Sequence, residues 1–186
     1  MTRLEAALLE AVALLDELGL HYMLIGGLAV AQWGEPRATL DVDLTVWVDP
    51  DRFESTIQIL ATRLAMRTEQ PSEFARRTRV LPAVASNGIP IDLLFAAWPL
   101  EHEAIDQAVV RSIAGAAVRI ARLDDLLLLK LISDRPKDLA DAAALLRRHR
   151  KDVNMDWLER ELSALAEAIA QPEILTRFRA LLRGEA

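Results

Sequence analysis

The chain contains no cysteine, which excludes disulfides, thiolate zinc sites and a cysteine nucleophile. Its three histidines are scattered and lack the spacing of metal ligands: His21, His102 and His149. Basic residues are outnumbered, with 22 Lys and Arg against 28 Asp and Glu, and the net charge is −6. We therefore expect no extended surface for binding nucleic acid, because such surfaces are basic.

Long hydrophobic runs are also missing. Uncharged stretches such as Tyr22 to Gly34 are far shorter than a membrane-spanning helix. Acidic residues interrupt the apolar N-terminal segment at Glu5, Glu10, Asp16 and Glu17, a pattern that excludes a signal peptide. The sequence therefore predicts a cytoplasmic protein without a membrane contact.

The remaining composition is that of a globular protein: 186 residues, 52% hydrophobic and 27% charged. Apolar or alternating runs predict strands at 22–25, 41–48, 77–84, 89–96 and 116–121. Helical spacing predicts helices at 4–18, 28–33, 51–66, 101–110, from 123 onward, and at 136–148, 155–169 and 172–183. This order predicts an α/β (α+β) domain over residues 1–150 and a helical C-terminal extension over 151–186.

The first candidate binding site is a turn in which a strand runs into two glycines and then a helix. Gly26 and Gly27 follow the strand predicted at 22–25. Glycines let the backbone approach a ligand closely, and the amides at a helix N-terminus favour phosphate. For this motif alone, a tight turn that binds nothing is an equally good interpretation.

Three aspartates form the second candidate site. Asp41 and Asp43 are two residues apart in a predicted strand, so their side chains lie on the same face. Asp92 interrupts the apolar strand IPIDLLF and points away from its core face. Three neighbouring carboxylates repel one another unless a cation lies among them, and Mg²⁺ prefers oxygen ligands. The three predict a Mg²⁺ site, although a solvated strand end would explain a lone Asp-x-Asp.

The third candidate is a helical segment that reads LDDLLLLKLISDRPKDLADAAALL. Lys130 is the only charge in its apolar part, in a chain with only three lysines. Such a lysine either extends to the surface or acts as a compact cation toward phosphate. Asp134, Asp138 and Asp141 share one helical face, for which capping and dipole compensation are the alternative explanation.

In their order, these motifs resemble the polymerase-β-like nucleotidyltransferase superfamily; they read IGGLAVAQWGEPRATLDVDL, IPIDLLF and LLLLKLISDRPKDLADAAALL. The lysine followed by R-x-K-D-x-x-D is most similar to the abortive-infection (AbiEii/AbiGii-type) toxin nucleotidyltransferases and their bacterial relatives. The resemblance covers roughly residues 22–147. It implies a nucleotidyltransferase fold, in which helices flank a mixed central sheet.

The resemblance also implies which residues bind the nucleotide. Gly26 and Gly27 would cradle the triphosphate of an NTP, and Arg37 and Thr39 would line its phosphate side. One departure concerns Gly27, because many active members have a serine there whose hydroxyl also reaches phosphate. The sequence leaves open whether Gly27 in place of this serine permits full activity.

The acids and the lysine receive catalytic roles from the same resemblance. Asp41 and Asp43 would bind Mg²⁺ in a two-ion site, and Asp92 would complete that site or act as base on the acceptor hydroxyl. Lys130 would contact phosphate as a catalytic and nucleotide-binding residue. The family's later acidic positions, also assigned to the nucleotide site, would be Asp138 and Asp141.

The implied reaction is Mg²⁺-dependent transfer of a nucleoside monophosphate from an NTP to an acceptor hydroxyl, with release of pyrophosphate. The acceptor would be RNA such as tRNA, a partner protein or a small molecule. One alternative is a catalytically weak binding partner in a toxin–antitoxin pair, and another is a metal-dependent nuclease or phosphatase. The sequence leaves open the acceptor, the NTP, the oligomeric state and the existence of a cognate antitoxin.

Overall fold

The computed structural model describes residues 1–34 and 38–183. The chain divides into two compact units. The sheet unit comprises Met1–Ala29 and Arg37–Ala121, and the helical unit comprises Val30–Pro36 and Arg122–Ala186. The predicted domain boundary after residue 150 is a different division of the chain, and it stays a prediction.

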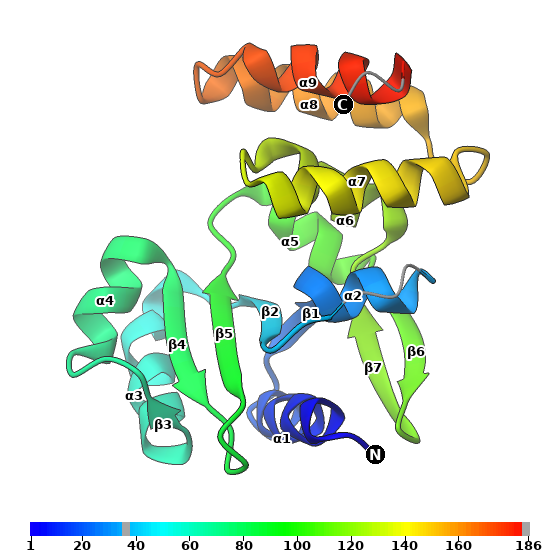
Figure 1. Ribbon diagram of the computed structural model, residues 1–186. Helices are drawn as coiled ribbons and strands as arrows, with labels where there is room; N and C mark the ends of the chain where they lie inside the picture. The colour runs from blue at the N-terminus through cyan, green and yellow to red at the C-terminus, as the bar shows by residue number, and fades with distance from the viewer. Residues whose placement is uncertain (35–37, 184–186) are drawn as a thin grey trace. The chain divides into compact units, whose positions relative to one another are not determined.

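The strands of the sheet unit are, in chain order, β1 (His21–Leu24), β2 (Val42–Trp47), β3 (Ala65–Met66), β4 (Val80–Val84), β5 (Pro90–Phe95), β6 (Val109–Ile113) and β7 (Ala116–Ile120). Within the described residues they form one sheet in the order β3-β4-β5-β2-β1-β7-β6 (Figure 1). Strand β2 pairs in parallel with β5, and β1 with β7, whereas the other pairs are antiparallel. The predicted mixed central sheet is confirmed.

The helical segments that begin in this unit are α1 (Arg3–Glu17), α2 (Gly26–Gln32), the 3₁₀ turn η1 (Pro50–Arg52), α3 (Phe53–Arg63), α4 (Pro71–Thr78) and α5 (Pro99–Asp106). A capping box starts α1, because Thr2 and Glu5 each accept a backbone N–H of the other. Helices α1 and α5 pack against β1 and β2, and α3 and α4 lie beside β3 and β4. The sheet therefore has helices along its centre and along one edge.

The alternation of β2 and β5 decides which side chains reach the core. Val42, Leu44 and Val46 of β2 are fully buried, as are Ile91 and Leu93 of β5. The residues between them in β5 are only partly buried. The predicted core faces of both strands are thus confirmed, and so is the placement of the strand acids away from them.

Three elements differ from the sequence-based prediction. The predicted strand 77–84 is in fact the end of α4 followed by β4, because Arg79 adopts a left-handed conformation (φ 61°) that ends the helix. Strand β3 has only two residues and carries no periodic signal. Strand β6 begins within the region predicted as helix 101–110, since α5 ends at Asp106.

The helical unit contains α6 (Leu123–Ile132), α7 (Pro136–His149), α8 (Met155–Ala168) and α9 (Glu173–Arg183). Helix α6 packs against α7, α8 and α9, and α8 lies along α9 (Figure 1). This central position explains why apolar residues occupy most sides of α6; the buried ones include Leu126, Leu127, Leu128 and Leu131. The helices predicted from 123 to 183 are confirmed.

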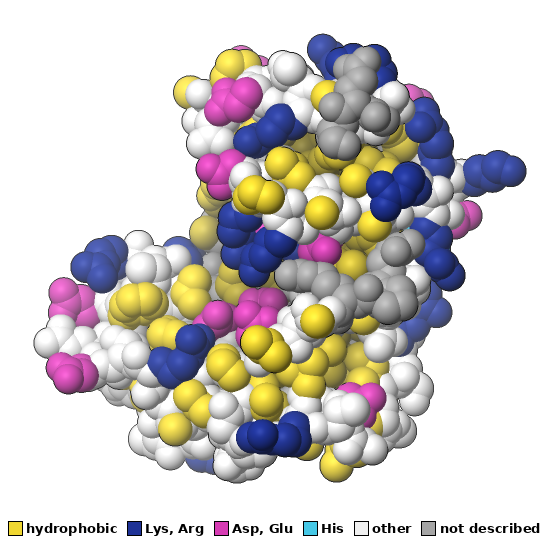
Figure 2. Space-filling model, viewed as in Figure 1, with side chains coloured by type: hydrophobic (Ala, Val, Ile, Leu, Met, Phe, Trp, Pro, Cys, Tyr) yellow, Lys and Arg dark blue, Asp and Glu magenta, His cyan; other side chains and the backbone are white. Residues whose placement is uncertain are grey.

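None of the helices in the described part of the chain is both long and apolar enough to cross a membrane. On the face shown in Figure 2, basic, acidic and hydrophobic side chains lie in small groups among one another. Charge of one sign therefore does not fill the visible face of either unit.

Candidate active site

The parallel register of β2 and β5 brings two predicted site residues together. Asp43 lies directly opposite Asp92, between the buried pairs Val42–Ile91 and Leu44–Leu93. Asp41 precedes Asp43 by two residues, and its charge acts on Asp92. All three carboxylates are partly exposed. We call Asp41, Asp43 and Asp92 the acidic cluster.

Gly26 makes room for one member of the acidic cluster. A Cβ atom on Gly26 would lie 1.9 Å from the Oδ2 atom of Asp43, which is an impossible contact. Gly26 also has a φ of 66°, in the left-handed region that favours glycine. The backbone N–H of the preceding Ile25 donates to the carbonyl of Asp43 at 2.9 Å. Gly26, the first glycine of the predicted turn, therefore lies against the carboxylate of Asp43. The next residue, Gly27, is buried.

A threonine orients a second member of the cluster. The Oγ1 hydroxyl of Thr39 donates to Oδ1 of Asp41 over 2.7 Å. Thr39 thus contacts a predicted metal ligand, and its own predicted contact with phosphate stays a prediction. Arg37, the other predicted phosphate-side residue, lies outside the described residues.

Asp92 has a basic partner that no sequence motif indicated. The Nη2 atom of Arg67 donates to Oδ1 of Asp92, and both side chains are about one third exposed. Burial raises the pKa of Asp92 above its usual range; the positive charge of Arg67 opposes this shift and the charge of Asp41 adds to it. Arg67 follows a segment predicted as one long helix, so only the pairing of β3 with β4 could have located it.

The acidic cluster suits Mg²⁺ by its chemistry, because it offers only carboxylate oxygens from neighbouring strands. The side chains do not form a ready-made cage, however. Among residues 1–34 and 38–183, no three His, Asp or Glu side chains are arranged so that they could hold a metal ion. Asp41 accepts a hydrogen bond from Thr39, and Asp92 faces Arg67. The carboxylate oxygens are ligands that Mg²⁺ prefers, but the three side chains would have to change conformation to coordinate one ion together.

The helical unit brings together the other three predicted residues. The Nζ atom of Lys130 on α6 lies 2.5 Å from Oδ1 of Asp138 and 3.0 Å from Oδ2 of Asp141, both on α7. The three side chains are at most 9% exposed. The interpretation of Lys130 as a lysine that extends to the surface is therefore wrong. Its contact with phosphate, and that of the two acids with a nucleotide, stay predictions.

Asp138 is also held by the turn between α6 and α7. Its Oδ2 atom accepts from the hydroxyl of Ser133 at 2.8 Å and from Nε of Arg135 at 2.5 Å. Burial tends to raise the pKa of Asp138, but the hydrogen bonds from Lys130 and Ser133 and the nearby positive charges outweigh it. The pKa of Asp138 therefore lies below its usual range, and a buried ionic network joins the two helices.

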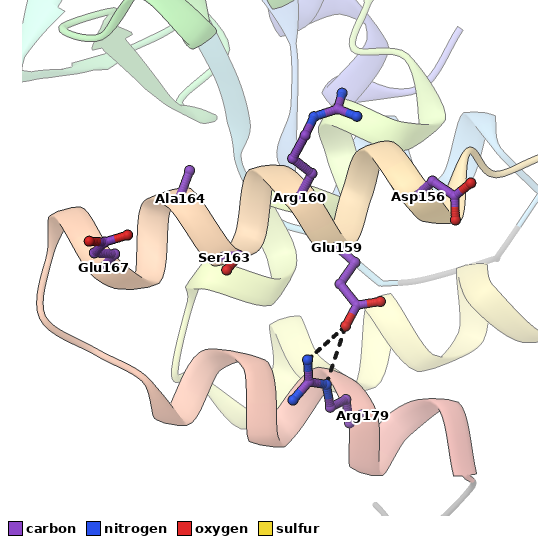
Figure 3. A pocket seen from close by; sticks show the side chains of 7 residues that line it. All are labelled: Asp156, Glu159, Arg160, Ser163, Ala164, Glu167 and Arg179. Carbon is purple, nitrogen blue, oxygen red and sulfur yellow. Dashed lines mark hydrogen bonds and ion pairs between the residues drawn. The ribbon is translucent and has the colours of Figure 1, made fainter.

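An open hollow of about 510 Å³ lies along α8, as Figure 3 shows. Six of its seven lining residues belong to α8, and Arg179 of α9 pairs with Glu159 at 2.8 Å. This hollow contains none of the residues predicted for the site.

A comparison with protein families identifies the family of the chain. The family model described as nucleotidyl transferase AbiEii toxin, type IV TA system, matches residues 7–185. No curated protein sequence matches the chain.

Solved structures of nucleotidyltransferases share the fold. The antibiotic-resistance factor ANT(2'')-Ia is 19% identical, with a TM-score of 0.54 over 91% of this chain and 94% of that one. A nucleotidyltransferase-like antigen from Paracoccidioides brasiliensis is 17% identical, with a TM-score of 0.52 over 94% and 90%. The lincosamide antibiotic adenylyltransferase LnuA is 16% identical, with a TM-score of 0.52 over 76% and 95%. At these identities the likeness shows the fold alone.

Substitution of Gly26 by alanine should displace Asp43. Gly19 is a matched control, because it has a similar φ of 63° and no atom within 4 Å of an added Cβ. We expect Gly19→Ala to lower the free energy of unfolding by about 1 kcal/mol through backbone strain. Gly26→Ala should cost about 2 kcal/mol more, because the carboxylate must move. Equal losses for both variants in urea denaturation would contradict the close approach.

Substitution of Lys130 by methionine should destabilise the helical unit. Removal of the ammonium leaves the buried Asp138 and Asp141 without their shared cation, at an expected loss of about 3–5 kcal/mol. The exposed Lys137 on α7 is the control, and Lys137→Met should change stability by at most about 0.5 kcal/mol. Chemical denaturation measures both. If Lys130→Met is as stable as Lys137→Met, the ionic network does not stabilise the fold.

The depressed pKa of Asp138 predicts a loss of stability in acid. The ionised carboxylate stabilises the folded state fully above the ordinary aspartate pKa of about 3.9, and this contribution is lost as pH falls through the lower folded-state pKa. In Asp138→Asn the free energy of unfolding should fall less steeply below about pH 4. The exposed Asp51→Asn, in the sheet unit, is the control. A slope that stays the same in Asp138→Asn would refute the expectation.

Proposed function

The chain belongs to the AbiEii nucleotidyl transferase toxin family, and on that premise we propose that it transfers a nucleoside monophosphate from an NTP to an acceptor hydroxyl, with Mg²⁺ and with release of pyrophosphate. The superfamily and the enzyme class predicted from the motifs are confirmed: the protein is a nucleotidyltransferase. The metal, the NTP and the acceptor are parts of the proposal.

The observation that carries the proposal is the pairing of Asp43 with Asp92 across β2 and β5, with Asp41 on the same face. Three carboxylates on adjacent strands form a concentration of negative charge that a divalent cation would relieve. Gly26 keeps this place open beside Asp43, since any side chain there would occupy the position of the carboxylate. The arrangement thus supports a site for a metal-bound triphosphate.

Asp41, Asp43 and Asp92 are the residues that would hold Mg²⁺, and the bound cation would offset triphosphate charge and favour ionisation of the acceptor hydroxyl. In the transfer, the acceptor oxygen forms a bond to the α-phosphorus while the bond to pyrophosphate breaks. Asp92 would either complete this metal site or, as the alternative role, accept the proton of the acceptor hydroxyl. Thr39 fixes the orientation of Asp41 through its hydrogen bond.

The family description also supports a biological role. Because that description names a toxin of type IV toxin–antitoxin systems, we infer that this chain acts as the toxin of such a pair. The proposal specifies the acceptor only by its reactive group, a hydroxyl that can attack the α-phosphorus.

Label transfer tests the proposal. The protein is incubated with each α-labelled NTP, Mg²⁺ and a cell lysate, and both labelled products and free pyrophosphate are measured. We expect label in one class of acceptor and an equal amount of pyrophosphate, and a loss of about 100-fold or more in Asp43→Asn. The exposed Asp51→Asn, in the same unit, should retain wild-type transfer.

Three results would contradict the proposal. Full transfer by Asp43→Asn would remove the acidic cluster from the site. Shortened nucleic acid without pyrophosphate would favour the nuclease alternative. Absence of transfer from all NTPs would favour the binding partner.

A further inference from the structure

Arg67 lies in the same row of the sheet as two members of the acidic cluster. Its backbone N–H donates to the carbonyl of Pro82 on β4 at 2.9 Å. Pro82 pairs with Asp92 on β5, and Asp92 pairs with Asp43 on β2. Residues at one register position of neighbouring strands share a face. The side chain of Arg67 is therefore directed across β4 toward the carboxylates.

The backbone of β4 holds the guanidinium through one of its N–H groups. Nε of Arg67 donates to the carbonyl of Ala83 at 3.1 Å, and Nη2 donates to Oδ1 of Asp92. Arginine has five N–H donors in a rigid plane, so one donor can stay bonded while another changes partner. The guanidinium of Arg67 could thus break its contact with Asp92 and keep its hydrogen bond to the backbone of β4.

The guanidinium of Arg67 lies against a carboxylate that a bound cation would use as a ligand. Asp92 faces Arg67, and the acidic cluster is not arranged as a cage among the described residues. A divalent ion that takes Asp92 as a ligand must compete with this ion pair, and it must also enter near a fixed positive charge.

We propose that Arg67 is a resident counter-ion of the acidic cluster, which neutralises Asp92 when no metal is bound and yields Asp92 to the incoming divalent cation. This inference rests on the proposed function, because it takes the acidic cluster to be the metal site. It assigns Arg67 two opposite effects. Arg67 stabilises the metal-free protein, and it weakens the affinity for the metal.

An ordinary surface ion pair is the competing explanation, and the chain offers a matched example. Arg63 forms two hydrogen bonds to Glu17, at 2.8 and 2.7 Å, in the same unit. Exposed pairs of this kind contribute little to stability and have no reason to affect metal binding. Arg63→Gln and Arg67→Gln change the net charge equally, so any difference between them reflects position.

Mn²⁺ binding to the full chain tests the proposal, with free Mn²⁺ measured by electron paramagnetic resonance. We expect Arg67→Gln to lower the Kd for Mn²⁺ by about tenfold, which corresponds to about 1.4 kcal/mol. The melting temperature of metal-free Arg67→Gln should be lower than that of the metal-free wild type. Mn²⁺ should raise the melting temperature of this variant by more than it raises that of the wild type. Arg67→Lys keeps the charge and should bind Mn²⁺ close to wild-type affinity, and Arg63→Gln should match the wild type.

A measurement on the wild type covers the case in which Arg67→Gln does not fold. On titration with Mg²⁺, the guanidinium NMR signals of Arg67 should shift, whereas those of Arg63 should not. Unchanged Arg67 signals at saturating Mg²⁺, or a Kd for Mn²⁺ in Arg67→Gln that is equal to or higher than in wild type, overturns the inference. Absence of Mn²⁺ binding by the wild type, or equal binding by Asp43→Asn, instead overturns the metal site in the proposed function.

Discussion

The register of β2 against β5 is the constraint on which the candidate site depends. Val42 and Leu44 face Ile91 and Leu93 across this parallel pair, and all four are fully buried. A shift of one residue would send the apolar side chains of a strand to the opposite face, at the cost of the core. The core therefore fixes the two acids between these pairs, Asp43 and Asp92, directly opposite each other. The burial of apolar side chains on both strands thus holds the two carboxylates opposite each other despite their mutual repulsion.

The neighbours of these carboxylates limit that repulsion in different ways. Gly26 supplies space, Thr39 supplies a hydrogen-bond donor to Asp41, and Arg67 supplies a positive charge to Asp92. In the helical unit, two neighbouring acids of α7 are also close together, and the buried Lys130 between them offsets their repulsion. The acidic cluster is only partly buried, so a ligand can reach its carboxylates. The buried network has hydrogen bonds and ion pairs that favour one fixed arrangement of α6 and α7.

Much of this arrangement could be predicted from local patterns. The period-two alternation of 41–48 and 89–96 predicted both core faces, and Asp92 was identified because it interrupts an apolar strand. Arg67 could not be found in this way, because its role depends on the pairing of a two-residue strand with β4. Likewise, spacing predicted that Asp138 and Asp141 share a helical face, and the family resemblance assigned them and Lys130 to one site. Neither predicted that the three side chains pair with one another. Such pairing depends on how α6 packs on α7, and no sequence period encodes it.

The central claim is that the acidic cluster binds the metal and nucleotide used in transfer. Its most direct test is the anomalous scattering of Mn²⁺ in crystals grown with a non-hydrolysable NTP analogue. We predict an anomalous peak within coordination distance of Asp41, Asp43 and Asp92, with the triphosphate beside Gly26. A triphosphate bound elsewhere in the chain, with no peak at these three carboxylates, would contradict the account.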